Sequence, residues 1–164
     1  MKYVYLFIII SISGEAYSQC NFKTGDYIED LTNPSSISLI KIDIPKSSKY
    51  AANAIKIITS NSVNIPPNLR KKFKANISVH YKFGICKYSG SVRQSGDLKD
   101  HLGFKDGKII RSLDVKLHKG NIINAVKFKL LLSSSRNGLN EILGVAVLKD
   151  LGFLAPDTFE VNTM

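Results

Sequence analysis

The segment at residues 126–161 places the strongest limit on what this chain can fold into. Apolar side chains alternate from Val126 to Leu132, which predicts the most apolar strand of the chain. A polar turn follows, and residues 139–151 then carry an apolar stripe near the helical period. We expect a buried strand followed by an amphipathic helix. The sequence ends at Met164 just as a further strand begins, without a visible neighbour, so we expect the domain to be incomplete.

Capping signals mark both ends of the predicted helix. Hydroxyl groups at residues 133–135 are suited to accept hydrogen bonds from the first backbone N–H groups of the helix. At the other end, Gly152 suits a left-handed cap, and Pro156 cannot continue a helix. We expect this to be the one main helix, packed on a sheet.

Upstream, alternating hydrophobicity predicts half-buried strands at residues 37–44, 75–83 and 109–117. Residues 85–93 either pair with 75–83 as a hairpin around Gly84 or continue it as one bent strand. Residues 51–59 suit a strand or a short helix, and their isoleucines favour a strand. The fold class predicted is α+β, with an antiparallel-rich sheet and one main helix.

The N-terminus has the pattern of an export signal. A basic start at Lys2 precedes an apolar run at residues 3–13, and Ala16-Tyr17-Ser18 supplies small residues for cleavage. The apolar run is shorter than the roughly 20 residues that cross a bilayer. We expect residues 1–18 to be a cleaved signal peptide, with an N-terminal membrane anchor as the alternative. The mature protein would then be periplasmic, secreted or on the cell surface, with no stable membrane span.

The chain is strongly basic, with a formal net charge of +10. Loss of residues 1–18 removes one lysine and one glutamate and leaves this charge unchanged. Such a charge favours acidic partners, either a cell-envelope polymer or an acidic protein. The tightest basic cluster, Arg70-Lys71-Lys72 with Lys74, is typical of a solvated loop. It carries no recognition motif for nucleic acid, which we do not expect as a partner.

Cysteine and histidine give little indication of a metal site. Export would permit a disulfide between Cys20 and Cys86, and two separate thiols are the alternative. Two cysteines do not form a structural zinc site by themselves, and the three histidines lack ligand spacing. We therefore predict no metal ligands in this chain.

Ordered short motifs in residues 88–162 resemble the CotH family, spore-coat-type kinases with an atypical protein-kinase-like fold. The motifs are Val92-Arg93 with Gly96, the strand at 112–117, Phe128-Lys129-Leu130-Leu131, Arg136-Asn137, Leu151-Gly152, Ala155-Pro156-Asp157-Thr158 and Val161. Beside the signal peptide at 1–18 and an N-terminal β-rich region at 19–75, the resemblance implies an incomplete kinase-like N-lobe at 76–164. In that family a further strand and the catalytic and metal-binding carboxylates follow, so no catalytic residue is assigned here.

The resemblance also suggests residues for a nucleotide site. Phosphoryl transfer uses a strand lysine to hold phosphates and a helix carboxylate to orient that lysine. Lys116 and Glu141 have the order and chemistry of this pair, Lys129 is a rival lysine, and Arg136 is placed to contact phosphate. The alternative is that both lysines simply face solvent and that Glu141 only favours the helix dipole. ATP and a divalent metal are implied only if the full-length protein is a kinase.

Three hypotheses for function follow. The first is an exported CotH-like protein related to atypical kinases, an incomplete fragment without the catalytic half and hence inactive alone. The second is an exported basic β-rich module that binds an acidic envelope component or partner protein. The third is a truncated product that exposes apolar surface.

Overall fold

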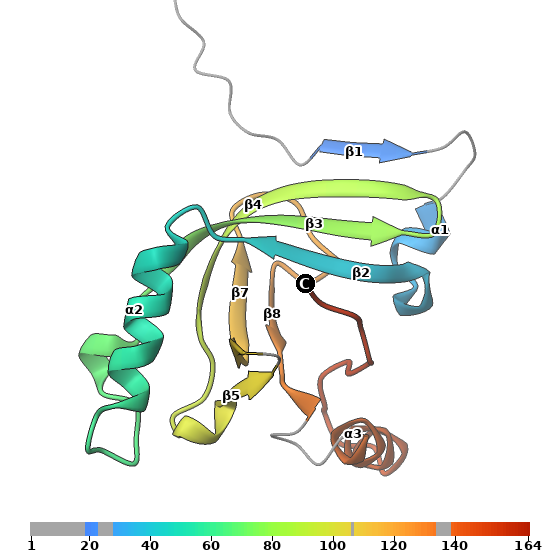
Figure 1. Ribbon diagram of the computed structural model, residues 1–164. Helices are drawn as coiled ribbons and strands as arrows, with labels where there is room; N and C mark the ends of the chain where they lie inside the picture. The colour runs from blue at the N-terminus through green and yellow to red at the C-terminus, as the bar shows by residue number, and fades with distance from the viewer. Residues whose placement is uncertain (1–18, 23–27, 106, 134–138) are drawn as a thin grey trace, which may run out of the picture.

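The structure is a computed structural model that describes residues 19–22, 28–105, 107–133 and 139–164. Within these residues the fold is α+β, with a curled six-stranded antiparallel sheet, a separate two-stranded hairpin and two longer helices (Figure 1). The predicted signal peptide and Arg136 lie outside the described residues.

The large sheet has the strand order β2-β3-β4-β7-β8, and β1 pairs with β4 beside this path. Its strands are β1 (Gln19–Phe22), β2 (Ile37–Asp43), β3 (Phe73–Tyr81), β4 (Gly84–Gln94), β7 (Leu113–Leu117) and β8 (Lys127–Leu130). The small hairpin consists of β5 (Leu102–Lys105) and β6 (Lys108–Arg111). The helices are α1 (Ile28–Leu31), α2 (Ser47–Ile58) and α3 (Asn140–Asp150), with short 3-10 turns η1 (Pro34–Ser36), η2 (Pro67–Leu69) and η3 (Lys99–His101).

Strand β4 is paired along both of its edges. Strand β3 follows one edge over its full length, joined to β4 by a tight turn that confirms the predicted hairpin. The other edge is shared, with β1 opposite residues 84–87 and β7 opposite residues 90–94. The pairing with β7 begins at Gly90. The two strands and Ile77 approach this residue closely, because a Cβ there would lie 2.7 Å from the Lys116 carbonyl oxygen and 2.7 Å from Ile77 Cδ1. No side chain fits at that position without moving backbone.

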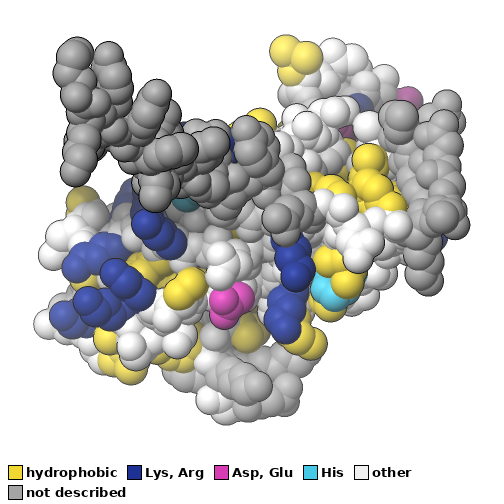
Figure 2. All heavy atoms as spheres, turned by 90° about the horizontal axis from the view of Figure 1, so that it is seen from above, with side chains coloured by type: hydrophobic (Ala, Val, Ile, Leu, Met, Phe, Trp, Pro, Cys, Tyr) yellow, Lys and Arg dark blue, Asp and Glu magenta, His cyan; other side chains and the backbone are white. Residues whose placement is uncertain are grey.

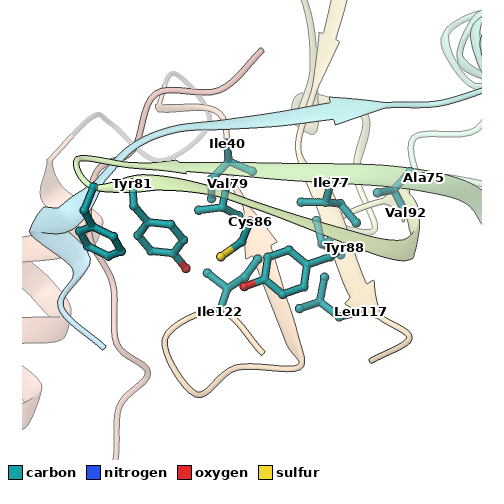
Figure 3. Packing of buried hydrophobic residues seen from close by; sticks show 12 residues of the cluster. Ile40, Ala75, Ile77, Val79, Tyr81, Cys86, Tyr88, Val92, Leu117 and Ile122 are labelled. Carbon is teal, nitrogen blue, oxygen red and sulfur yellow. The ribbon is translucent and has the colours of Figure 1, made fainter. Parts of the chain in front are cut away.

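The core lies inside the curl of the sheet. Alternate residues of β3 and β4 point inward, and Ile77, Val79 and Cys86 are fully buried. Figure 3 shows them facing Leu117 and Ile122 across the same space, beside Tyr81 and Tyr88. Burial is the main factor that raises the pKa of both tyrosines. Each fully buried aliphatic side chain contributes about 1.5–3 kcal/mol, so this inner face dominates the stability of the sheet.

Residues 51–59 form a helix, and the expected strand is wrong. Helix α2 buries Asn53, Ala54 and Ile57, which share one helical face, while Ile55 is 53% exposed. The apolar period is therefore helical, and the β propensity of isoleucine does not decide the local structure. Asn53 Nδ2 donates to the Leu69 carbonyl at 2.9 Å and ties the helix to η2.

A buried arginine at the end of β6 holds α2 against the small hairpin. The Arg111 guanidinium lies 3.5 Å from the centre of the Tyr50 ring, and its Nη2 donates to the Tyr50 carbonyl at 3.0 Å. Tyr50 also packs edge-on against Phe73, with ring centres 5.2 Å apart. Burial raises the pKa of Tyr50 to about 12 and lowers that of Arg111. The Nε and Nη1 atoms of Arg111 are buried without a hydrogen-bond partner in the described part of the chain.

Helix α3 forms where it is predicted and its C-terminal cap is confirmed, but the expected hydroxyl cap is wrong, because Leu139 stands at the N-cap and no side chain caps the helix there. Gly152 has φ +82°, its N–H donates to the Lys149 carbonyl, and the Phe153 N–H donates to the Leu148 carbonyl, each at 2.9 Å. This is the left-handed arrangement that glycine favours.

The expectation that this helix packs on the sheet is wrong. Helix α3 buries none of its residues, and Leu139, Leu143 and Leu151 are all more than 60% exposed. Figure 1 places α3 below the sheet and away from β3 and β4. The core inside the curl contains Tyr81, Tyr88 and Ile122 and no residue of α3. Its exposed apolar surface agrees with the third hypothesis in part.

The strand expected at residues 109–117 is broken at Ser112. The Ser112 N–H bonds to the His101 carbonyl, and its hydroxyl accepts from the Leu132 N–H at 3.0 Å. The chain therefore changes sheets there, from β6 to β7. Strand β8 is half-buried rather than buried, because it forms an edge of the sheet.

The last residues have a neighbour, contrary to expectation. The Ile40 N–H donates to the Asn162 carbonyl at 2.9 Å, and the Ile42 N–H donates to the Met164 carbonyl at 2.9 Å. The segment runs parallel to β2 along its outer edge. It thus satisfies backbone groups that an edge strand would otherwise expose.

Cys20 and Cys86 form a disulfide between directly opposed residues of β1 and β4, with Cα atoms 4.0 Å apart. Strand β1 is only four residues long, and this disulfide links it covalently to β4.

We predict that Cys20→Ser lowers the free energy of unfolding by about 4 kcal/mol, the loop-closure value for a bridge between residues 66 apart. Denaturant unfolding measures this change. Reductant added to the unaltered protein should reproduce it, and reductant added to the variant should have no further effect. An unchanged midpoint in the variant would show that the sheet does not depend on this bond.

Candidate anion-binding face

The outer face of the large sheet is rich in lysine. Because side chains alternate along a strand, the residues between the buried ones point to solvent. The basic residues on this face, exposed except for the partly buried Arg93, are Lys41, Lys74, Lys87, Arg93, Lys116, Lys127 and Lys129. Figure 2 shows Lys and Arg side chains in two groups on the molecule as seen from above, with an acidic patch between the groups.

Strand register places several of these residues in a row across four strands. Ser91 of β4 is opposite Lys74 of β3 on one side and Lys116 of β7 on the other. Lys116 is in turn opposite Lys127 of β8. We call this set, Lys74, Ser91, Lys116 and Lys127, the lysine row. Neighbouring strands lie about 4.8 Å apart, so the row concentrates positive charge within a short distance.

A depression of about 210 Å³ lies over the lysine row. Its lining includes Lys72, Ser91, Arg93, Asp114, Lys116 and Lys127, with Val92 and Val115. The loop before β3 and the strands β4, β7 and β8 thus all contribute to it.

The one carboxylate in this lining is occupied by other groups. Asp114 Oδ2 accepts from Arg93 Nε at 2.9 Å and lies 2.7 Å from Arg93 Nη2. Asp114 Oδ1 accepts from the Ser95 hydroxyl at 2.9 Å. The Asp114 side chain is only 10% exposed, whereas Arg93 is 41% exposed. Asp114 therefore neutralises Arg93 and leaves the lysines of the row uncompensated.

Lys116 and Lys127 are opposed like charges. Among the described residues neither lysine has an acidic partner, and a directly opposite pair of equal charges destabilises a sheet. A structural role does not account for this pair. An anion bound over the row would remove the repulsion.

The structure separates the residues predicted for a nucleotide site. Lys116 and Lys129 lie on the same face, Lys116 in the depression and Lys129 opposite Asp114 in the next row. Glu141 begins α3, which contributes no residue to the depression.

Of the polar residues that line the depression, Lys116 is a predicted site residue, and the sequence did not indicate a site role for Lys72, Ser91, Arg93, Asp114 and Lys127. The alternation of β8 indicates that Lys127 faces outward. Its position opposite Lys116 depends on register, which the sequence alone does not define.

A second hollow, of about 460 Å³, lies beside Asn61, Val63 and Lys99. The Lys99 ammonium donates to the carbonyls of Ile58 and Ser60, where α2 ends, so its charge caps that helix. This hollow offers no available charged group comparable to the lysine row.

Over the described ranges there is no group of three or more His, Cys, Asp or Glu residues suited to a metal, and no helix is long and apolar enough to cross a membrane. Comparison with protein-family models, curated proteins and solved structures found no match for this chain.

We predict that Lys116→Gln raises the stability of the sheet slightly, by less than about 1 kcal/mol, because it removes the repulsion from Lys127. Thermal unfolding at low and at high salt measures the effect, which should shrink as salt screens the charges. Lys87→Gln is the matched control, since Lys87 lies opposite Ser78. A loss of stability specific to Lys116→Gln would mean that Lys116 is a structural residue.

Proposed function

We propose that this chain is an exported binding module that uses the outer face of its large sheet to bind an anionic polymer of the cell envelope. The observation that carries this proposal is the lysine row with its opposed Lys116 and Lys127. Charges that cost stability and lack an acidic partner are typical of a surface that meets an oppositely charged ligand.

The shape of the surface also supports a polymer. The basic residues are spread over β2, β3, β4, β7 and β8 rather than gathered in one deep pocket. An array of charges spread over five strands suits a long ligand that makes many weak contacts. The depression over the lysine row is too open and too small to enclose a large substrate.

Two features support export. The first is the signal-like pattern of residues 1–18. The second is the disulfide between Cys20 and Cys86, because such bonds persist in oxidising compartments.

The purified protein should bind anionic polymers, and its affinity should fall steeply as salt rises. The logarithm of the binding constant should decrease linearly with the logarithm of salt concentration, with a slope of about one unit per charge contacted. Titration calorimetry at several chloride concentrations measures this slope. Binding that is insensitive to salt, or absent at low salt, would contradict the proposal.

Asp114→Asn tests the proposal with a substitution that should raise the affinity for the polymer. It releases Arg93 from its ion pair and should therefore strengthen polymer binding while it lowers stability. If the substitution only damaged the fold, polymer affinity and stability would both fall.

A second candidate is the kinase-related hypothesis, in which the chain is the N-terminal portion of an exported CotH-like protein. The observation in its favour is that Lys116 lies on β7, a strand paired on both sides, and lines a polar depression. Such a lysine is placed to hold phosphates. The separation of Glu141 from the depression counts against a complete nucleotide site.

Thermal unfolding with MgATP tests this candidate. If Lys116 binds nucleotide, MgATP should raise the unfolding temperature, and Lys116→Ala should abolish that rise. Lys87→Ala is the control, since it removes the same charge from the same face outside the depression. If MgATP raised the unfolding temperature equally in the unaltered protein, Lys116→Ala and Lys87→Ala, Lys116 would not be a nucleotide-binding residue.

A further inference from the structure

We infer that the ligand of the lysine row is a polyol-phosphate chain, a polymer of phosphodiester units without bases, whose successive phosphates lie over adjacent rows of the sheet. This inference rests on the proposed function and specifies the chemistry of the polymer. The lysines at the depression, the distance between rows and the residue types on the outer face support it.

The donors around the depression favour a phosphate group. Ammonium groups of Lys72, Lys116 and Lys127 approach from the loop before β3, from β7 and from β8, and Ser91 lies in β4 between them. No hydrogen bond within the described residues occupies these three lysines. Lysine ammonium groups act as point charges that bind phosphate oxygens well, because they do not require the planar geometry of an arginine fork. The one arginine here, Arg93, is already paired with Asp114.

The spacing of the rows matches a phosphodiester chain. The second row contains Arg93, Asp114 and Lys129, each two residues along its strand from a member of the lysine row. Alternate residues of a strand are about 6.6–6.8 Å apart, across six backbone bonds. Successive phosphates of a glycerol-phosphate chain are also separated by six covalent bonds. An extended chain that follows β8 therefore meets Lys127 with one phosphate and Lys129 with the next, while the Asp114 carboxylate beside them on β7 is paired with Arg93.

The composition of the face disfavours nucleic acid, which has the same phosphate spacing. Single-stranded nucleic acid is bound by grooves that combine positive charge with aromatic side chains on which the bases stack. The aromatic residues of the strands, Phe73, Tyr81, Tyr88 and Phe128, alternate with the outward lysines and pack in or against the core. Within the described strands of the large sheet, each phenylalanine and tyrosine packs in or against the core and none shares the outer face with the lysine row.

Calorimetric titration with three polymers of matched charge tests the inference: a glycerol-phosphate oligomer, poly-L-glutamate and oligothymidylate. The glycerol-phosphate oligomer should bind about tenfold more tightly than either of the others. The double variant Lys116→Gln/Lys127→Gln should lose that preference, with a fall of about two units in the salt slope. Both substitutions are at exposed positions, so the variant should fold.

The control is Lys41→Gln/Lys87→Gln. These lysines flank Ser78 on the same face, outside the depression, and their loss removes the same charge. The control should weaken binding to all three polymers similarly and keep the preference.

The outcomes separate the inference from the function on which it rests. Equal affinity for the glycerol-phosphate oligomer and poly-L-glutamate, or an equal loss of preference in the two double variants, overturns the inference and leaves the binding module standing. Tighter binding to poly-L-glutamate points to an acidic protein partner, and tighter binding to oligothymidylate points to nucleic acid; each overturns the inference. If none of the polymers binds at low salt, the proposed function itself fails.

Discussion

The pairing of β4 along both edges determines the position of nearly everything else in the molecule. Strand β3 occupies one edge, while β1 and β7 share the other and exchange places at Gly90, where only hydrogen fits on the Cα atom. The same register sets the outer surface, because Ser91 is opposite both Lys74 and Lys116. The core and the basic face are therefore two sides of one hydrogen-bonding pattern, and a shift in register would destroy both.

The two arginines beside β7 show how the protein distributes its few acidic groups. Arg93, partly exposed, takes the carboxylate of Asp114, which the Ser95 hydroxyl also holds. Arg111, buried, has the Tyr50 carbonyl and ring, and two of its N–H atoms lack a partner in the described structure. Burying an incompletely paired cation is costly, whereas the Asp114 carboxylate pairs with the partly exposed Arg93 and not with the lysines of the row. The outer face consequently keeps its positive potential.

Much of the sheet could be predicted from alternation alone, because strands with one buried face have a clear period of two. The segments around β2 and β3 and the hairpin to β4 follow from this signal. Helix α2 was missed because its isoleucines also suit a strand, and only the burial of Ala54 and Ile57 on one side decides between them. The exposure of α3 and the opposition of Lys116 and Lys127 depend on tertiary packing and on register, which local periodicity does not contain.

The parallel pairing of the C-terminal residues with β2 has a consequence for the order of folding. Asn162 contacts the Ser38 carbonyl across 124 residues of sequence. During synthesis β2 and the hairpin of β3 and β4 emerge long before the segment at 162–164 that covers the outer edge of β2. That edge is therefore open to other chains until residues 162–164 leave the ribosome, so strand-to-strand aggregation competes with the pairing of this segment during that interval.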